Sequence, residues 1–262
     1  MNNSIMNISN SQLMLTYIFA LIAMIITSFN GINRNKDFIV GTIRMTVQLF
    51  AAGFILVYIF ESTSFILSAL MIALMEFFAV FNIFTNKKGK LNKSLKTTII
   101  LAQVIGTIFT LVFFLLVVVR PDPIYNPQYL IPLGGMIIGN SMTGINLALN
   151  QMLSSIENNR TNIEGSLMLG ASPRQAMDKI IQRSFDTAIT PTLNSIKNMG
   201  IITLPGMMTG QILGGVSPMI AIRYQIAIMT AIMSSSTICV FIFLHLGYKN
   251  FFNDQKQLVE GK

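Results

Sequence analysis

The sequence predicts an all-α membrane protein with about seven transmembrane helices. Its residues are 52% hydrophobic and only 11% charged, whereas soluble domains carry about 25% charged residues. The run at 97–119, TTIILAQVIGTIFTLVFFLLVVV, contains no charged residue. At about 1.5 Å per residue it forms a helix of about 34 Å, enough to cross a hydrocarbon core of about 30 Å. We therefore expect residues 1–262 to form one multi-pass domain in the lipid bilayer of the plasma membrane.

The expected spans follow the apolar runs in order. The first run follows MNNSIMNISNSQ, which has no basic residue. A cleaved signal peptide would begin with basic residues, so the first run is predicted to be a retained helix. Each later run is bounded by polar or charged residues, which set its ends to within a few residues. The expected spans are 12–29, 39–60, 63–85, 97–119, 130–150, 188–207 and 218–246.

Basic residues gather in alternate loops, and this pattern predicts the orientation. With seven spans and the N-terminus outside, four basic segments fall on one side, whereas the opposite loops hold only Arg120. The basic side is expected to be cytoplasmic, which places the C-terminus there. The net charge of +8 is therefore a topology signal, and no nucleic-acid partner is expected. The basic residues on the cytoplasmic side are Arg34, Lys36, Lys87, Lys88, Lys90, Lys93, Lys96, Arg160, Arg174, Lys179, Arg183, Lys249, Lys256 and Lys262.

The cytoplasmic segment 151–187 is the longest predicted loop. Its apolar residues recur among charges at a spacing compatible with two short amphipathic helices. Gly170 can end the first helix in a left-handed conformation, while Ser172 can cap the second and Pro173 fits its first turn. A helix–corner–helix presented to the cytosol is therefore expected.

The stretch EGSLMLGAS at 164–172 resembles the E-A-A-x-x-L-G-A-S loop of ABC-transporter permeases. In that family the loop forms a coupling helix, which lies in a groove of the ATPase subunit and transmits its closure. The resemblance assigns ATPase coupling to Glu164, Gly165, Ser166, Leu169, Gly170, Ala171 and Ser172. Gly165 and Ser166 replace the two alanines, and the proline expected about 13 residues after the glycine is absent, with Pro191 coming later.

Three further stretches are similar to the Fet-type iron-export permeases, a family with plant relatives linked to aluminium tolerance. They are IPLGGMIIGNSM (131–142), TPTLNSIKNMGIITLPGMMTGQILGG (190–215) and YQIAIMTAIM (224–233). The resemblance implies a non-enzymatic permease subunit. No G-x-x-x-x-G-K-[ST] phosphate loop occurs in the sequence, which agrees with a subunit that lacks its own ATPase, and no cofactor is expected in this chain. ATP and Mg²⁺ are expected on a partner ABC ATPase.

The sixth span is predicted to be kinked or broken at Pro205, which has no N–H to donate. Broken helices often line transport sites, which makes Pro205, Met207, Met208 and Gln211 candidates for a translocation path. The alternative is helix packing, since Gly210-x-x-x-Gly214 is a small-xxx-small face.

Glu76 is the only acid well inside a predicted span, where burial costs at least about 2.5 kcal/mol. It should be paired, protonated or facing water. Lys197 lies at a similar depth in the sixth span, which predicts a Glu76–Lys197 pair, with Arg44 as the second candidate. Asn140 and Asn194 add polar groups that either join helices or line a hydrated path.

The residues do not independently predict a metal. One His, one Cys and one intramembrane acid are too few for a strong metal site in one chain. Glu76, Met207 and Met208 are weak candidates for metal ligands. A homodimer would present these residues twice around one path. Thioethers favour Cu(I) on ligand softness, so iron rests on the resemblance. An ABC permease for another solute and an ATP-independent secondary transporter both remain open.

Overall fold

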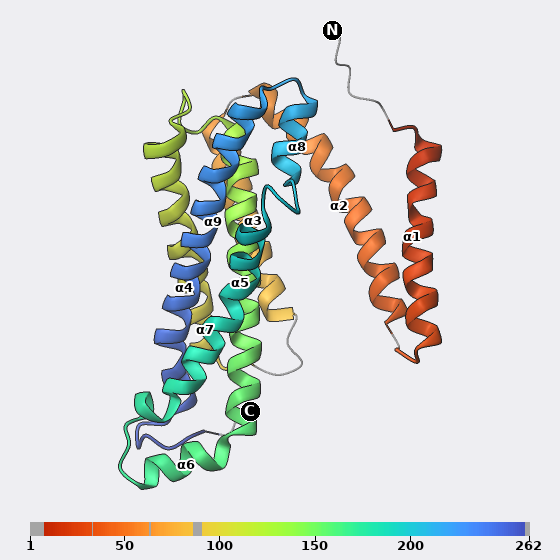
Figure 1. Cartoon of the computed structure of the whole chain (residues 1–262). Helices are drawn as coiled ribbons and strands as arrows, with labels where there is room; N and C mark the ends of the chain where they lie inside the picture. Colours follow the sequence, from red (N-terminus) through yellow and green to blue (C-terminus); the bar gives the residue numbers. More distant parts are fainter. Residues whose placement is uncertain (1–7, 33, 63, 86–90, 260–262) are drawn as a thin grey trace. The chain divides into compact units, whose positions relative to one another are not determined.

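The computed structural model describes residues 8–32, 34–62, 64–85 and 91–259. In this part of the chain the regular structure is helical, with two isolated bridges and no β-strand (Figure 1). Lys87, Lys88 and Lys90, which contribute to the predicted orientation, lie outside the described residues. The helices are α1 (Asn10–Phe29), α2 (Asn35–Ser62), α3 (Phe65–Thr85), α4 (Lys93–Phe113) with a π-helical continuation (Phe114–Val119), α5 (Pro127–Asn158), α6 (Arg160–Met168), α7 (Pro173–Asn198), α8 (Gly206–Leu213) and α9 (Pro218–Gly247).

Two compact units make up the chain. The first holds α1 and α2 together with Leu213–Gly215. Ser9 begins α1 with a capping box in which its side chain accepts from the Gln12 N–H. The Tyr17 hydroxyl lies 2.7 Å from the Thr46 Oγ1 and joins α1 to α2. Apolar side chains cover both helices and remain exposed, as expected of helices whose solvent is lipid.

The second unit is a bundle of α3–α7 and α9, together with most of α8. α9 packs against α4, α5 and α7, and α5 also packs against α3 and α7. Small residues allow close approach at these contacts. An added Cβ at Gly106 in α4 would stand 2.3 Å from the Cys239 Sγ of α9, and one at Gly144 in α5 would stand 3.2 Å from Val240. The core is therefore closely packed around α9.

Among the described residues, five helices are long and apolar enough to cross a membrane: α1, α2, α3, α4 with its π-helical continuation, and α9 with the short turn that follows it. These lie within a few residues of the first four predicted spans and the last one. The fifth predicted span lies inside α5, which is longer and extends to Asn158. The predicted sixth span, 188–207, does not correspond to one helix: α7 begins at Pro173 and ends at Asn198.

The chain is broken between α7 and α8. A break was expected at Pro205, and the helix already ends at Asn198, so residues 199–205 form an irregular segment. Gly200 has a left-handed φ of +88°, and its N–H donates to the Thr203 carbonyl. The Thr209 hydroxyl donates to the Pro205 carbonyl at 3.1 Å. Backbone groups freed at a break in a membrane helix must be satisfied internally, and these local bonds satisfy part of them.

Candidate functional site

The helix–corner–helix predicted around residue 170 is present. α6 ends at Met168, and the Ala171 N–H donates to the Ser166 carbonyl while the Gly170 N–H donates to the Leu167 carbonyl. This is a Schellman arrangement, which requires a left-handed residue after the helix end. Gly170 supplies it with φ +91°. The glycine fixes the corner through its backbone.

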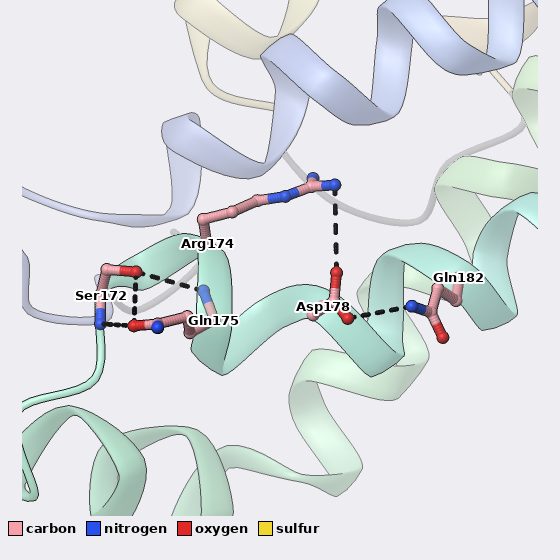
Figure 2. Close-up of polar contacts among 5 residues, drawn as sticks. All are labelled: Ser172, Arg174, Gln175, Asp178 and Gln182. Atoms are coloured by element: carbon pink, nitrogen blue, oxygen red, sulfur yellow. Dashed lines mark hydrogen bonds and ion pairs between the residues drawn. The ribbon is translucent and has the colours of Figure 1, made fainter.

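α7 begins immediately after this corner with a complete capping box (Figure 2). The Ser172 N–H donates to the Gln175 Oε1 at 2.9 Å, and the Gln175 N–H points back to the Ser172 Oγ at 3.4 Å. Asp178 then accepts from Gln182 at 2.9 Å and lies 4.0 Å from Arg174. Pro173 occupies the first turn, where its missing N–H costs nothing. The second helix is longer than the short one expected, because α7 continues for 26 residues.

α6 is anchored on one side and exposed at its tip. Ile163 is 2% exposed and belongs to the core, whereas Met168 and Leu169 are 86% and 91% exposed. Glu164 faces the surface and forms an ion pair with Arg160 at 2.8 Å. Met168 and Leu169 thus form an exposed apolar knob at the end of an anchored helix.

The two departures from the alanine pattern do not disturb α6. A Cβ at Gly165 would meet no described atom within 4 Å, so alanine fits there. The Ser166 hydroxyl donates to the Asn162 carbonyl at 2.8 Å, a bond made within the helix. Both positions are helical, as the resemblance implies for the residues that follow the acid.

A buried polar layer lies within the bundle. Glu76 of α3 is 6% exposed, and its Oε1 is hydrogen-bonded to the hydroxyl of Thr107 in α4. Thr107 also bonds the Gln103 carbonyl, one turn earlier, at 2.7 Å. The Glu76 Oε2 and the Gln103 Oε1 are buried without a hydrogen-bond partner among the described residues. Two acceptor oxygens inside the bundle can therefore still accept hydrogen bonds.

The predicted Glu76–Lys197 pair is wrong. Within the described part of the chain, Glu76 forms no ion pair with Lys197, which is exposed. Two residues at the same depth in the membrane can still face different directions around their helix axes. The Glu76 carboxyl is instead hydrogen-bonded to Thr107, on a neighbouring helix. Asn194 is exposed on α7 and Asn140 on α5, where its amide donates to the Met136 carbonyl at 2.8 Å.

The remaining predicted path residues lie near the α7–α8 break. Pro205, Met207, Met208 and Gln211 are half-buried, and the Gln211 Oε1 has no partner among the described residues. Met208 lines a cavity formed by α7, α8 and α9, whereas Glu76 lines an apolar groove between α3 and α4. The structure therefore separates the candidate residues into two places, and their role in a path stays a prediction.

No cluster of three or more His, Cys, Asp or Glu residues suited to a metal occurs among the described residues. Sequence reasoning missed Thr107 and Gln103, although both are polar residues one helical turn apart in an apolar run. It also missed Gln225, Met229 and Met233, which repeat every four residues along α9. In both cases the signal was a spacing that places side chains on one helix face.

Comparison with known proteins identifies the family of this chain. The sequence profile of the Uncharacterised protein family (UPF0014) matches residues 10–252. The chain belongs to the UPF0014 family. It is 32% identical to the "Probable iron export permease protein FetB" of Escherichia coli (strain K12), over 97% of this chain and 96% of that one. It is 35% identical to the "UPF0014 membrane protein YjkA" of Bacillus subtilis (strain 168), over 96% and 98%.

A plant relative is also similar over most of its length. The chain is 33% identical to the "Protein ALUMINUM SENSITIVE 3" of Arabidopsis thaliana, over 92% of this chain and 86% of that one. No solved structure matches. Together with its apolar helices, the relatives identify this UPF0014 member as a multi-pass membrane permease.

Proposed function

We propose that this UPF0014 protein is the transmembrane subunit of an ABC transporter that exports a metal ion, iron being the leading candidate. The supporting observation is the corner between α6 and α7, where Met168 and Leu169 are exposed on a helix anchored by Ile163. ATP and Mg²⁺ bind to a separate ATPase subunit, whose groove receives this knob. The name of the Escherichia coli relative supports the iron cargo.

The proposed topology has seven spans, with the N-terminus outside and the C-terminus in the cytoplasm of a cell whose plasma membrane holds the protein. α5 and the α7–α8 pair complete the set begun by the five most apolar helices. Both are less apolar, as helices that face other helices and a path can be. Basic residues of α6, α7 and the C-terminal segment then share the cytoplasmic side.

Two copies are proposed to assemble around a two-fold axis, each with its own ATPase. A closed C₂ dimer places the same residues on both sides of one path, so that Glu76, Met207 and Met208 occur twice. Each copy offers weak donors, and weak binding suits a site that must release its cargo.

The test is ATP-dependent efflux in vesicles that contain this protein and its ATPase, with Fe²⁺, Cu⁺, Mn²⁺ and Zn²⁺ compared. Leu169→Glu is the informative variant, because a side chain that is 91% exposed can be changed without disturbing the fold. It should lower both ATPase binding and efflux at least tenfold. Ile124→Glu is the matched control: Ile124 is an exposed apolar residue in the loop on the opposite proposed face.

The outcomes separate the alternatives. Efflux that persists without ATP identifies a secondary transporter. ATP-dependent efflux of another metal or solute keeps the coupling and replaces the iron cargo. Normal ATPase binding and efflux in Leu169→Glu would show that the corner is not the coupling element.

A further inference from the structure

A methionine-lined cavity lies where α7, the irregular segment 199–205, α8 and α9 meet. Its volume is about 510 Å³, which exceeds the roughly 30 Å³ that one water occupies in the liquid. Four methionines line it: Met199 after the end of α7, Met208 in α8, and Met229 and Met233 in α9. Methionine often fills gaps in a core, yet these four border open space and are only half-buried.

The positions of these methionines follow from local structure. Gln225, Met229 and Met233 stand four residues apart, so they share one face of α9. The break after Asn198 turns the chain out of the α7 helix at Met199, and α8 brings Met208 to the same cavity. Three separate segments therefore contribute methionines to one cavity.

Gln225 gives the cavity a polar wall. It is 5% exposed and its amide Nε2 lies 3.7 Å from the Met199 Sδ, as a donor. Its Oε1 is buried without a hydrogen-bond partner among the described residues. Buried amide oxygens are normally hydrogen-bonded, so this oxygen has acceptor capacity left for an occupant of the cavity.

The ligand atoms that line the cavity determine which kind of ion it can bind. Thioethers are soft, uncharged ligands that select Cu(I), whereas Fe²⁺, Mn²⁺ and Zn²⁺ prefer ligands that include carboxylate, imidazole or thiolate. No Asp, Glu, His or Cys is among the described residues that line this cavity. A monovalent ion also loses less hydration energy than a divalent one on entering an apolar site.

We propose that the cavity binds one soft monovalent cation, Cu(I) or its close analogue Ag(I), through Met208, Met229, Met233 and Met199, with Gln225 orienting Met199. The site does not depend on the coupling to an ATPase proposed above. Failure of either proposal leaves the other standing, because binding here is measured on the isolated full-length protein.

The experiment is a Cu(I) titration of the full chain in lipid nanodiscs, under reducing anaerobic conditions, in competition with a chromogenic Cu(I) chelator. One Cu(I) per chain is expected, with sulfur scatterers in the X-ray absorption spectrum. Met229→Leu and Met208→Leu should each raise Kd about tenfold or more, since even the loss of an outer partner of a metal ligand costs 10–100-fold. An excess of Fe²⁺, Mn²⁺ or Zn²⁺ should not displace the ion.

Met136→Leu is the matched control, because Met136 is also half-buried but is not among the residues that line this cavity. Its Kd should equal that of the native protein. Leucine matches methionine in volume, and two variants on different helices keep the test valid if one of them fails to fold. The proposal is overturned by absent stoichiometric binding, by equal loss in Met136→Leu, or by binding that only Cys239→Ser abolishes.

Discussion

Replacing Glu76 with leucine should stabilise the protein while it abolishes transport. The carboxyl is 6% exposed, and its Oε2 has no partner among the described residues. An acid at the centre of a span costs about 2.5 kcal/mol, and a leucine there gains about 0.5 kcal/mol. The substitution also removes the hydrogen bond with Thr107, worth about 1 kcal/mol. Thr107 is not left unpaired, because it bonds the Gln103 carbonyl at 2.7 Å.

When the lost hydrogen bond is subtracted from the two gains, Glu76→Leu is expected to stabilise the protein by about 1–2 kcal/mol. The lower end of this range applies because the unfolded state also shields part of the carboxyl. It can be measured by unfolding in mixed micelles, followed through helical circular dichroism and through labelling of Cys239, which is buried in the folded protein. Metal efflux in vesicles is measured on the same variant. Glu76→Gln, which keeps the volume and a polar end, should fall between the native protein and Glu76→Leu in stability.

Thr107→Val tests the origin of this effect. Valine has the shape of threonine without its hydroxyl, so the variant leaves the Glu76 carboxyl without its donor and should lower stability by about 1–3 kcal/mol. The same change made in Glu76→Leu should cost clearly less, because the carboxyl is already gone. A loss of more than 1 kcal/mol in Glu76→Leu alone would refute the reasoning, since it would show that the carboxyl supports the fold.

Three further predictions concern backbone and packing. Gly106→Ala should destabilise the bundle by about 1–3 kcal/mol in the same unfolding assay, because its Cβ would stand 2.3 Å from the Cys239 Sγ; an unchanged midpoint would contradict this packing. Gly165→Ala should raise stability by about 0.5–1 kcal/mol, whereas Gly170→Ala, at φ +91°, should lower it by about 1–2 kcal/mol; the two variants control each other, and equal effects would refute the assigned corner. Ser172→Ala should cost about 1 kcal/mol and increase amide hydrogen exchange in the first turn of α7, with exchange at the start of α1 as the internal reference.

The corner was predictable because the rules that form it are local. Gly170, Ser172 and Pro173 act on backbone groups within a few residues, so their spacing alone predicts a helix end, a turn and a cap. Most spans were predictable for a similar reason, since lipid requires long apolar runs.

Pairing between helices was not predictable. Glu76 and Lys197 were matched by depth, but rotation about the helix axis and the order of helices decide which side chains meet. The length of α7 was also missed, because the loop 151–187 and the span 188–207 were predicted as separate elements, whereas one helix runs through the boundary between them. Pro191 lies inside α7, where Thr190 and Ser195 donate to backbone carbonyls four residues earlier, a bonding pattern that often accompanies bending.

The length of α7 joins the two candidate regions mechanically. Its first residue follows the Ser172 cap at the corner, and its last residue precedes Met199 in the methionine-lined cavity. A helix of 26 residues is about 39 Å long, so one element reaches from the proposed ATPase contact to the methionine-lined cavity. A displacement of the corner would therefore move one wall of the cavity without a relay of side chains. Glu76 lies on α3, which packs on α4 and α5 but not on α7, so the same displacement could reach it only indirectly, through α5 or through α9 and α4. Coupling to an ATPase would thus act first on access to the methionines and only afterwards on the buried carboxyl.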